Sequence, residues 1–318
     1  MGFGSYRSAD WSRLKTSRGI NSNSNVNDLF KNKHLDEKYD PLKINMRESR
    51  DSEDSPESTP IIISFDDTGS MGYLATEIAT NSLNKTVTEI YDKNPVTNPH
   101  VMCAAYGNAG DVAPLQVTQF EADIKIVEQL LDLWMVLRGR GDSGDPLIWY
   151  FAAKHTSIDS YEKRGKKGFL FTIGDDTIKG SIAGHYIKEI FDDDEYYTKY
   201  LAPEEILAMA REKYHVFHIV TKPLNANVYN TWRKLLPDST ALVSSDNISN
   251  LYMVIISLMQ MVNGQSKEDV INQWPAEVRN EIRNAVCDIK VDPPKNSQAA
   301  SGAQEEPKKT LLDKLFGN

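Results

Sequence analysis

Runs of apolar, β-branched residues alternate with amphipathic stretches through the middle of the chain. Residues 61–65 form the first run, whose length and composition predict a central strand buried on both faces. The same pattern predicts further strands, and apolar residues at helical spacing predict the helices between them. The predicted strands are 101–107, 115–120, 169–174, 215–221 and 240–244, and the predicted helices are about 72–92, 123–137, from 146 onward, about 225–236 and about 248–262.

The order of these elements defines a fold class. Residues 101–107 and 115–120 are joined by a short connection, which predicts a hairpin with an antiparallel edge strand. Beyond that hairpin, strands and helices alternate, as they do when parallel strands are joined by crossover helices. The sequence therefore predicts an α/β fold, a Rossmann-like, doubly wound and mostly parallel sheet with helices on both faces.

The flanking segments differ in composition from this middle region. Residues 1–59 are polar, and we predict an N-terminal arm and linker whose few aromatic residues either fold back on the domain or dock onto a partner. The main domain is predicted to span residues 60–263, followed by a helical extension at 264–291. Residues 292–318 are rich in Pro, Ala, Ser and charge and end in a small amphipathic cluster, which predicts a flexible linker and a short docking tail.

Net charge and hydropathy argue against a nucleic-acid-binding, membrane-spanning or secreted protein. The formal net charge of −9 disfavours general nucleic-acid binding, because proteins meet polyanions with basic surfaces. The most hydrophobic window, residues 251–262, is too short to cross a bilayer. The N-terminus lacks the continuous apolar segment of a secretory signal. We therefore expect a cytoplasmic protein that binds neither nucleic acid nor membrane.

Three segments are rich in acidic or hydroxyl side chains. Two of them begin at the end of a predicted strand, and the third is a Gly-rich loop before the helix predicted from residue 146. They are residues 66–70, 139–145 and 174–176. Ligands of open parallel sheets bind at the carboxyl ends of the strands, where the strand order reverses. Although these segments are distant in sequence, we expect them to converge there.

The first segment, Asp66-Asp67-Thr68-Gly69-Ser70-Met71, resembles the metal-ion-dependent adhesion site of von Willebrand factor A (VWA) domains. That family has Asp-Xaa-Ser-Xaa-Ser at the end of its first strand, and Thr68 replaces the first Ser here. Gly174-Asp175 matches the family's third segment, an Asp beside a Gly after the fourth strand. The resemblance covers roughly residues 60–263 and is to the intracellular bacterial or phage type.

The middle segment departs from the family pattern. VWA domains supply a Thr from a Gly-rich loop, and Gly141 stands at that place here, followed by Asp142 and Ser143. Asp142, Ser143 or a water can fill the gap, and we expect Asp142 to bind the cation more tightly because its carboxylate adds negative charge. The resemblance thus implies a Mg²⁺ or Mn²⁺ site formed by Asp66, Thr68, Ser70, Asp142, Ser143 and Asp175.

This mixture of ligands suits a hard cation. Mg²⁺ takes six oxygens and keeps some of its waters. The hydroxyls of Thr68 and Ser70 are neutral ligands, while Asp66 and Asp175 hold coordinated water. A cation bound mainly by neutral groups stays electrophilic, so it can accept a carboxylate from a partner protein.

Three other interpretations compete with a metal-dependent adaptor. In the simplest, Asp66 and Asp67 only cap the following helix. In the second, the motif belongs to a haloacid dehalogenase-like phosphohydrolase with Asp66 as nucleophile, although Asp67 and Thr68 depart from the related motifs. In the third, the chain is a structural assembly component whose metal stabilises one loop.

The sequence favours a non-enzymatic, metal-dependent protein-binding adaptor within a multiprotein assembly. Bacterial VWA proteins commonly accompany MoxR-type AAA+ ATPases, so the resemblance suggests an AAA+ ATPase as the protein partner that contributes a carboxylate.

Overall fold

The computed structural model describes residues 6–21, 24–137, 144–178, 180–221 and 226–291. Within them lies a six-stranded sheet in the order β10-β9-β6-β2-β3-β4. All neighbours are parallel except β3 and β4. Its strands are β2 (Thr59–Asp66), β3 (Pro99–Tyr106), β4 (Leu115–Val117), β6 (Gly168–Gly174), β9 (Tyr214–Val220) and β10 (Thr240–Leu242). The predicted mostly parallel sheet with one antiparallel edge strand is therefore confirmed.

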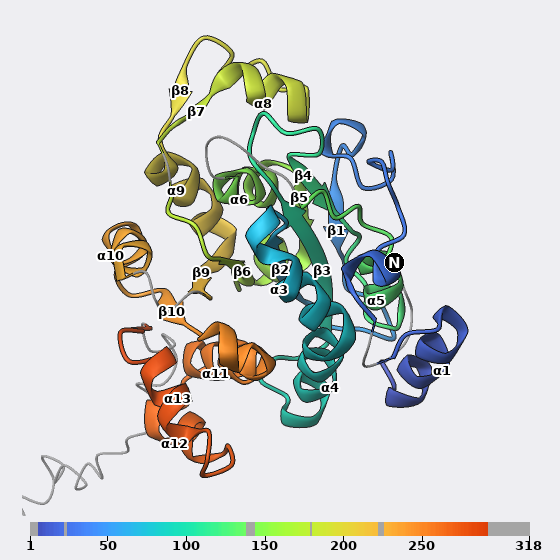
Figure 1. Cartoon of the computed structure of the whole chain (residues 1–318). Coiled ribbons are helices and arrows are strands. Elements are labelled where there is room, and N and C mark those ends of the chain that lie inside the picture. The colour runs from blue at the N-terminus through green and yellow to red at the C-terminus, as the bar shows by residue number, and fades with distance from the viewer. Residues whose placement is uncertain (1–5, 22–23, 138–143, 179, 222–225, 292–318) are drawn as a thin grey trace, which may run out of the picture.

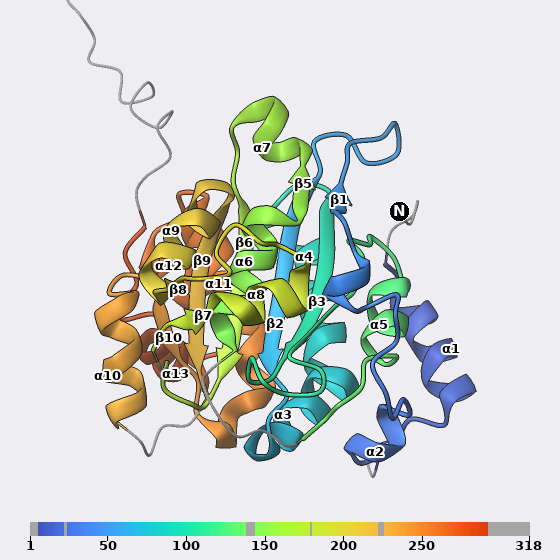
Figure 2. The ribbon, with the colours of Figure 1, turned by 90° about the horizontal axis from the view of Figure 1, so that it is seen from above.

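Helices cover both faces of this sheet, as Figures 1 and 2 show from two directions. Side chains alternate along a strand, so Ile61 and Ile63 of β2 join one core cluster and Ile62 joins the other. The first face is covered by α3 (Gly72–Glu77), α4 (Leu83–Lys93), α5 (Lys125–Leu130), α11 (Leu251–Val262), α12 (Lys267–Asn272) and α13 (Arg279–Ala285). The second is covered by α6 (Asp145–Lys154), α8 (Gly184–Phe191), α9 (Pro203–Lys213) and α10 (Ala226–Leu235).

The helix predicted for residues 123–137 is shorter in the structure. Helix α5 ends at Leu130, and the chain then runs past β4. The Gln116 side chain donates to the Trp134 carbonyl at 2.7 Å and accepts from the Trp134 amide at 2.9 Å. This pair of hydrogen bonds holds the segment against the sheet, where apolar spacing alone predicted further helical turns.

The described part of the N-terminal arm folds back on the domain. It contains α1 (Ser8–Arg18), α2 (Val26–Leu29), a 3₁₀ turn η1 (Pro41–Lys43) and β1 (Arg47–Ser49), which pairs in parallel with β5 (Thr156–Ile158). Most of its buried apolar side chains belong to the core cluster on the first face: Tyr6, Trp11, Leu14, Ile20, Leu29, Phe30 and Tyr39. The alternative in which the arm folds back is thus the one observed, and hydrophobic burial stabilises it.

The arm also covers the edge strand β4. The backbone amide of Val117 donates to the Tyr39 carbonyl at 3.0 Å. The Arg47 guanidinium donates to the Val117 carbonyl at 3.1 Å. The residues just after β1 are tied down as well, because Asp51 accepts from the Ser58 amide and forms an ion pair with Arg164.

Two further elements extend the second face. They are α7 (Asp159–Arg164) and a small hairpin of β7 (Ile182–Ala183) and β8 (Tyr200–Leu201). Within the described part of the chain, no helix combines the length and apolarity that crossing a bilayer requires.

Candidate metal site

The strand order reverses at β2. From β2 the chain moves to β3 and β4 on one side, and then to β6, β9 and β10 on the other. Adjacent carboxyl ends at such a reversal leave a crevice between the loops that follow them. Asp66 is the last residue of β2, and Asp175 comes directly after β6. Two of the predicted ligands therefore lie at the reversal point of the sheet.

Asp66 is almost fully buried at this edge, with 5% of its surface exposed. Its Oδ1 accepts a hydrogen bond from the Thr68 backbone amide at 2.7 Å. Burial raises the pKa of Asp66 to about 7, hydrogen bonds from Thr68 oppose this rise, and nearby Asp145 and Asp175 add repulsion. Asp66, Asp145 and Asp175 therefore influence one another electrostatically at this edge of the sheet.

Gly174 brings the end of β6 close to Asp66. A methyl group on its Cα would lie 3.1 Å from the Tyr106 hydroxyl and 3.5 Å from Asp66 Cβ. The Tyr106 hydroxyl donates to the Ile173 carbonyl at 3.1 Å. Burial, Asp145 and Asp66 raise the pKa of Tyr106 well above its ordinary value, so this hydroxyl stays protonated. Glycine therefore permits the close packing of the two strand ends.

Asp145 is placed at the same edge by the first turn of α6. The helix has Pro146 in its first turn, and Gly144 just before it packs on the end of β3. A Cβ on Gly144 would lie 1.6 Å from the Gly107 carbonyl oxygen, so only glycine fits this contact. Asp145, with 3% of its surface exposed, contributes to the electrostatics of Asp66.

A row of polar side chains lies beneath these acids on the second face of the sheet. Ser64, Thr172 and His218 stand at paired positions of β2, β6 and β9. Thr172 Oγ1 and His218 Nδ1 are 2.8 Å apart, and the same nitrogen lies 3.5 Å from Asp145 Oδ1. Burial lowers the pKa of His218 well below its ordinary value, so the ring is neutral.

Helix α10 contacts this row through Trp232. Its ring stacks on His218 with centroids 3.4 Å apart and planes 9° apart. Its Nε1 donates to the Asp176 carbonyl at 2.9 Å, in the loop that carries Asp175. Trp232 therefore connects α10 to the segment after β6 and, through His218, to Asp145.

The six predicted ligands have different outcomes. The structure brings Asp66 and Asp175 together, with Thr68 immediately beyond β2. Ser70 lies in a short 3₁₀ turn, η2 (Gly69–Met71), but its side chain is outside the described part of the structure. Asp142 and Ser143 are also outside the described residues. The assignment of metal ligands remains a prediction.

The described donors fit a hard cation, because they offer carboxylate and hydroxyl oxygens. Among the residues that the structure describes, no cluster of three or more His, Cys, Asp or Glu side chains has the geometry of a metal site. A VWA-type site draws on hydroxyls and on the middle loop, whose residues 138–143 lie outside that description.

Sequence reasoning missed part of this site. Tyr106 and His218 lie outside the three segments that the sequence connects with the site. His218 is fully buried, because α10 covers that face of β9. Asp145 was noted only as a nearby charge. The signal for all three is their position at or near a strand or helix end on neighbouring elements.

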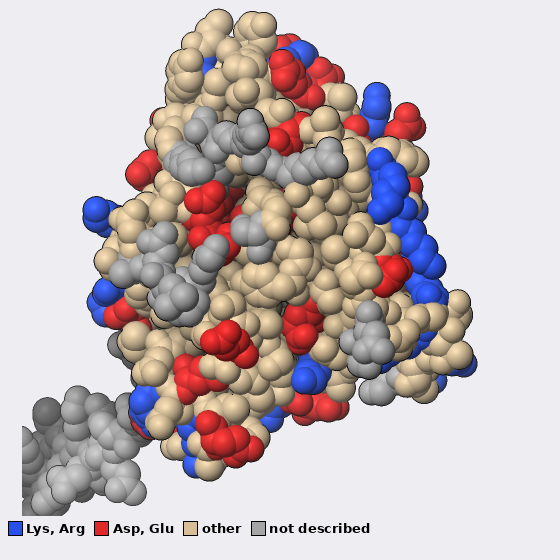
Figure 3. All heavy atoms as spheres, viewed as in Figure 1, with Lys and Arg blue, Asp and Glu red and all other residues tan. Residues whose placement is uncertain are grey.

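Figure 3 shows a group of acidic side chains just left of the centre of this face, with further acidic groups below it. Basic side chains lie mainly toward the edges of the same view. This distribution leaves the central part of that face with a negative character, which favours cations and cationic groups.

Comparisons with known proteins found solved structures that resemble part of this chain at low identity. No protein-family model matches the sequence, and no curated protein matches it. The vWF domain of the pili tip protein Mfa5 from Porphyromonas gingivalis matches 66% of this chain and 98% of its own, at 10% identity and a TM-score of 0.44. The open form of the pilus adhesin SpaC from Lactobacillus rhamnosus GG matches 67% of this chain at 10% identity and a TM-score of 0.42. The mussel byssus protein PTMP1 matches 64% of this chain and 47% of its own, at 13% identity and a TM-score of 0.38.

The matched region spans 31% of the SpaC chain. At such identities the likeness concerns architecture alone. The structure itself shows the mixed α/β sheet with helices on both faces, consistent with a VWA or Rossmann-like fold. The metal site rests on the sequence motif and remains a prediction.

Proposed function

We propose that this chain is a non-enzymatic, intracellular adaptor that binds a partner protein through a Mg²⁺ or Mn²⁺ ion. Asp66, Thr68, Ser70 and Asp175 would hold the cation together with Asp142 or Ser143. The observation that carries the proposal is the meeting of buried Asp66 with Asp175 and Asp145 at the reversal point of the sheet. When bound, the cation would offer an open position to a carboxylate of the partner.

The helix-capping alternative explains only part of this arrangement. Asp66 does accept a hydrogen bond from the Thr68 amide, as a capping residue would. Capping does not require two further carboxylates beside it, and their repulsion costs stability without a counter-charge. A binding site is a better explanation than a cap for retaining all three.

The partner is proposed to present a carboxylate, and a MoxR-type AAA+ ATPase is the candidate that the VWA resemblance suggests. A ligand carboxylate completes the coordination of a cation held largely by neutral hydroxyls. The buried acids of the site would otherwise repel an acidic partner. We therefore expect metal to be essential for the contact.

Capture of the partner should depend on both the cation and Asp66. We expect the full chain to retain a partner from native lysate in Mg²⁺, and to lose it in chelator or as Asp66→Asn. Asp176, the exposed residue that follows Asp175, gives a control. Asp176→Asn removes the same amount of negative charge from the same edge of the sheet. Capture that survives both chelation and Asp66→Asn would contradict the adaptor, and phosphate-ester hydrolysis lost in Asp66→Asn would favour the enzyme instead.

Trp232 should raise the affinity for the cation although it is not a ligand itself. Trp232→Phe removes the hydrogen bond to the Asp176 carbonyl, which fixes the loop after β6. Losing one such bond costs about 1 kcal/mol, so we expect about fivefold weaker Mg²⁺ binding by calorimetric titration.

Trp149 of α6 supplies the matched control for that measurement. It packs edge-on against Trp232 with centroids 6.0 Å apart, and its Nε1 has no hydrogen-bond partner among the described residues. Trp149→Phe therefore removes the same atoms without breaking a hydrogen bond. Equal loss of affinity in the two variants would show that packing, and not the bond to Asp176, is responsible.

A further inference from the structure

Asp67 is a buried carboxylate that the proposed metal site does not use. Only 1% of its surface is exposed, and its backbone is fixed by hydrogen bonds with Tyr106 and Leu137. The backbone amide of Val136 lies nearby, yet no described residue makes a hydrogen bond of normal geometry to either carboxylate oxygen. Leaving a buried charged group without a partner is costly, so such a group needs an explanation.

A second carboxylate faces the same space. Asp111, in the loop after β3, accepts hydrogen bonds at its Oδ2 from the Asn108 amide at 2.7 Å and from Asn108 Nδ2 at 3.2 Å. A methyl group on the Cα of Gly107 would lie 2.8 Å from Asp111 Oδ2 and 3.1 Å from Asp67 Oδ1. The two oxygens thus border one small space that exists because residue 107 has no side chain.

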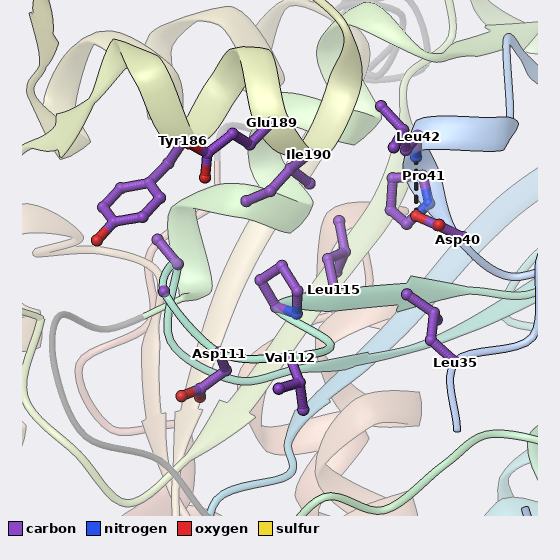
Figure 4. Close-up of a pocket in the computed structure, with 13 residues that line it drawn as sticks. Leu35, Asp40, Pro41, Leu42, Asp111, Val112, Leu115, Tyr186, Glu189 and Ile190 are labelled. Atoms are coloured by element: carbon purple, nitrogen blue, oxygen red, sulfur yellow. Dashed lines mark hydrogen bonds between the residues drawn. The ribbon is translucent and has the colours of Figure 1, made fainter. Parts of the chain in front are cut away.

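Asp111 is partly exposed and can be reached from solvent. Asp111 also lines a pocket of about 320 Å³ between the arm, the loop after β3 and helix α8. Figure 4 shows Asp111 and Val112 on the loop side, Tyr186 and Glu189 on α8, and Asp40 on the arm. The lining contains no Lys or Arg. Water and small cations can therefore reach Asp111 without any rearrangement of the core.

We propose that Asp67 and Asp111 bind a second divalent cation over Gly107, with water from the pocket completing its oxygen shell. Mg²⁺ and Mn²⁺ sites in proteins commonly use one or two carboxylates and several waters. The orphaned oxygens of Asp67 and the fixed carboxylate of Asp111 meet that requirement. The cation would hold the loop after β3 against the end of β2.

The second site goes beyond the proposed function and does not depend on it. Its ligands, Asp67 and Asp111, are not among the proposed ligands of the first site. That site uses the two residues that flank Asp67 in the sequence, Asp66 and Thr68. The competing explanation is that Asp67 simply carries a proton. These two explanations predict different numbers of bound ions.

The test counts Mn²⁺ ions bound to the full chain at pH 8 by calorimetric titration and by the electron paramagnetic resonance signal of free Mn²⁺. We expect two ions in the wild-type protein and one in Asp111→Asn, with at least a tenfold loss of affinity at the second site. Gly107→Ala should lose the same ion, because the added methyl occupies the space while both carboxylates remain. Glu189→Gln, which removes equal charge from the same pocket, should still bind two.

The outcomes separate the two sites. If Asp111→Asn and Gly107→Ala bind as many ions as the wild-type protein, the second site is wrong and Asp67 is protonated. If Asp66→Asn alone loses no ion while Asp111→Asn loses one, the second site stands and the first assignment fails. Thermal unfolding of each variant identifies any that is misfolded, and the remaining variant of the pair then decides.

Discussion

Without metal, Asp66→Asn should be more stable than the wild-type protein at pH 8, by about 2–4 kcal/mol. Burial raises the pKa of Asp66 from 3.8 to about 7 in the folded protein. Between these two pH values the unfolded chain has released the proton and the folded chain still holds it. The resulting contribution to stability is present below pH 3.8 and is lost as pH rises through about 7.

Asparagine removes this cost because it cannot ionise, and it still accepts the Thr68 amide hydrogen bond. The stability difference should therefore grow from about pH 4 to pH 7 and level off above. Mg²⁺ should stabilise the wild-type protein and leave Asp66→Asn unchanged, since only binding to the folded state shifts unfolding. Chemical denaturation across this pH range, in chelator and in Mg²⁺, measures both effects.

Asp176→Asn is the control for Asp66→Asn, because Asp176 is exposed at the same edge. It should change the free energy of unfolding little at any pH. An Asp66→Asn protein that is less stable than wild type at pH 8 in chelator would show that the carboxylate makes net favourable contacts. The interpretation of Asp66 as a residue retained for binding would then be wrong.

Truncating Phe30 in the arm should destabilise the whole domain by about 3–5 kcal/mol. Phe30 is 1% exposed and belongs to the same core cluster as β2 and α4. Removal of a buried aromatic side chain loses its transfer free energy and leaves a cavity. Urea unfolding of Phe30→Ala should show a lower midpoint with a single transition, because the arm and the domain unfold together.

Leu42 provides the comparison for Phe30 within the same arm. It is 41% exposed, so Leu42→Ala should cost far less. If Phe30→Ala costs no more than Leu42→Ala, the arm is only loosely attached. Its role as a segment that docks onto a partner would then regain support.

The sheet, and the meeting of Asp66 with Asp175 at one edge of it, could be predicted because their signals are local and periodic. Residues 61–65 and 169–174 are short apolar runs that end in acids, and parallel strands place their carboxyl ends at one edge. The reversal of strand order between β2 and β6 then brings Asp66 and Asp175 together. No long-range information was needed for this inference.

The packing of the arm could not be predicted in the same way. Its buried residues, such as Trp11, Phe30 and Tyr39, are scattered among polar residues without a helical or strand period. They lie in separate short segments of the arm, so no single stretch has a sustained amphipathic pattern. The burial of His218 was missed for a related reason, since it depends on Trp232 of α10.

The burial of Asp67 without a hydrogen-bond partner could not be predicted from the local sequence either. Asp67 follows Asp66 in the motif and looks like a second surface acid in the sequence. Its lack of partners emerges only when the loop after β3 and Gly107 are placed beside it. Whether Asp142 or Ser143 replaces the family's Thr stays a prediction, because both lie outside the described residues.

The contact of the arm with β4 has a consequence for self-association. An edge strand with free amides and carbonyls is a template onto which a strand of another molecule can add, and this is a common route to aggregation. Here the outward amide and carbonyl of Val117 are both taken, by Tyr39 and Arg47 of the same chain. The arm thus protects the short antiparallel edge against intermolecular strand addition. A protein made without the arm would expose an unpaired, aggregation-prone edge strand.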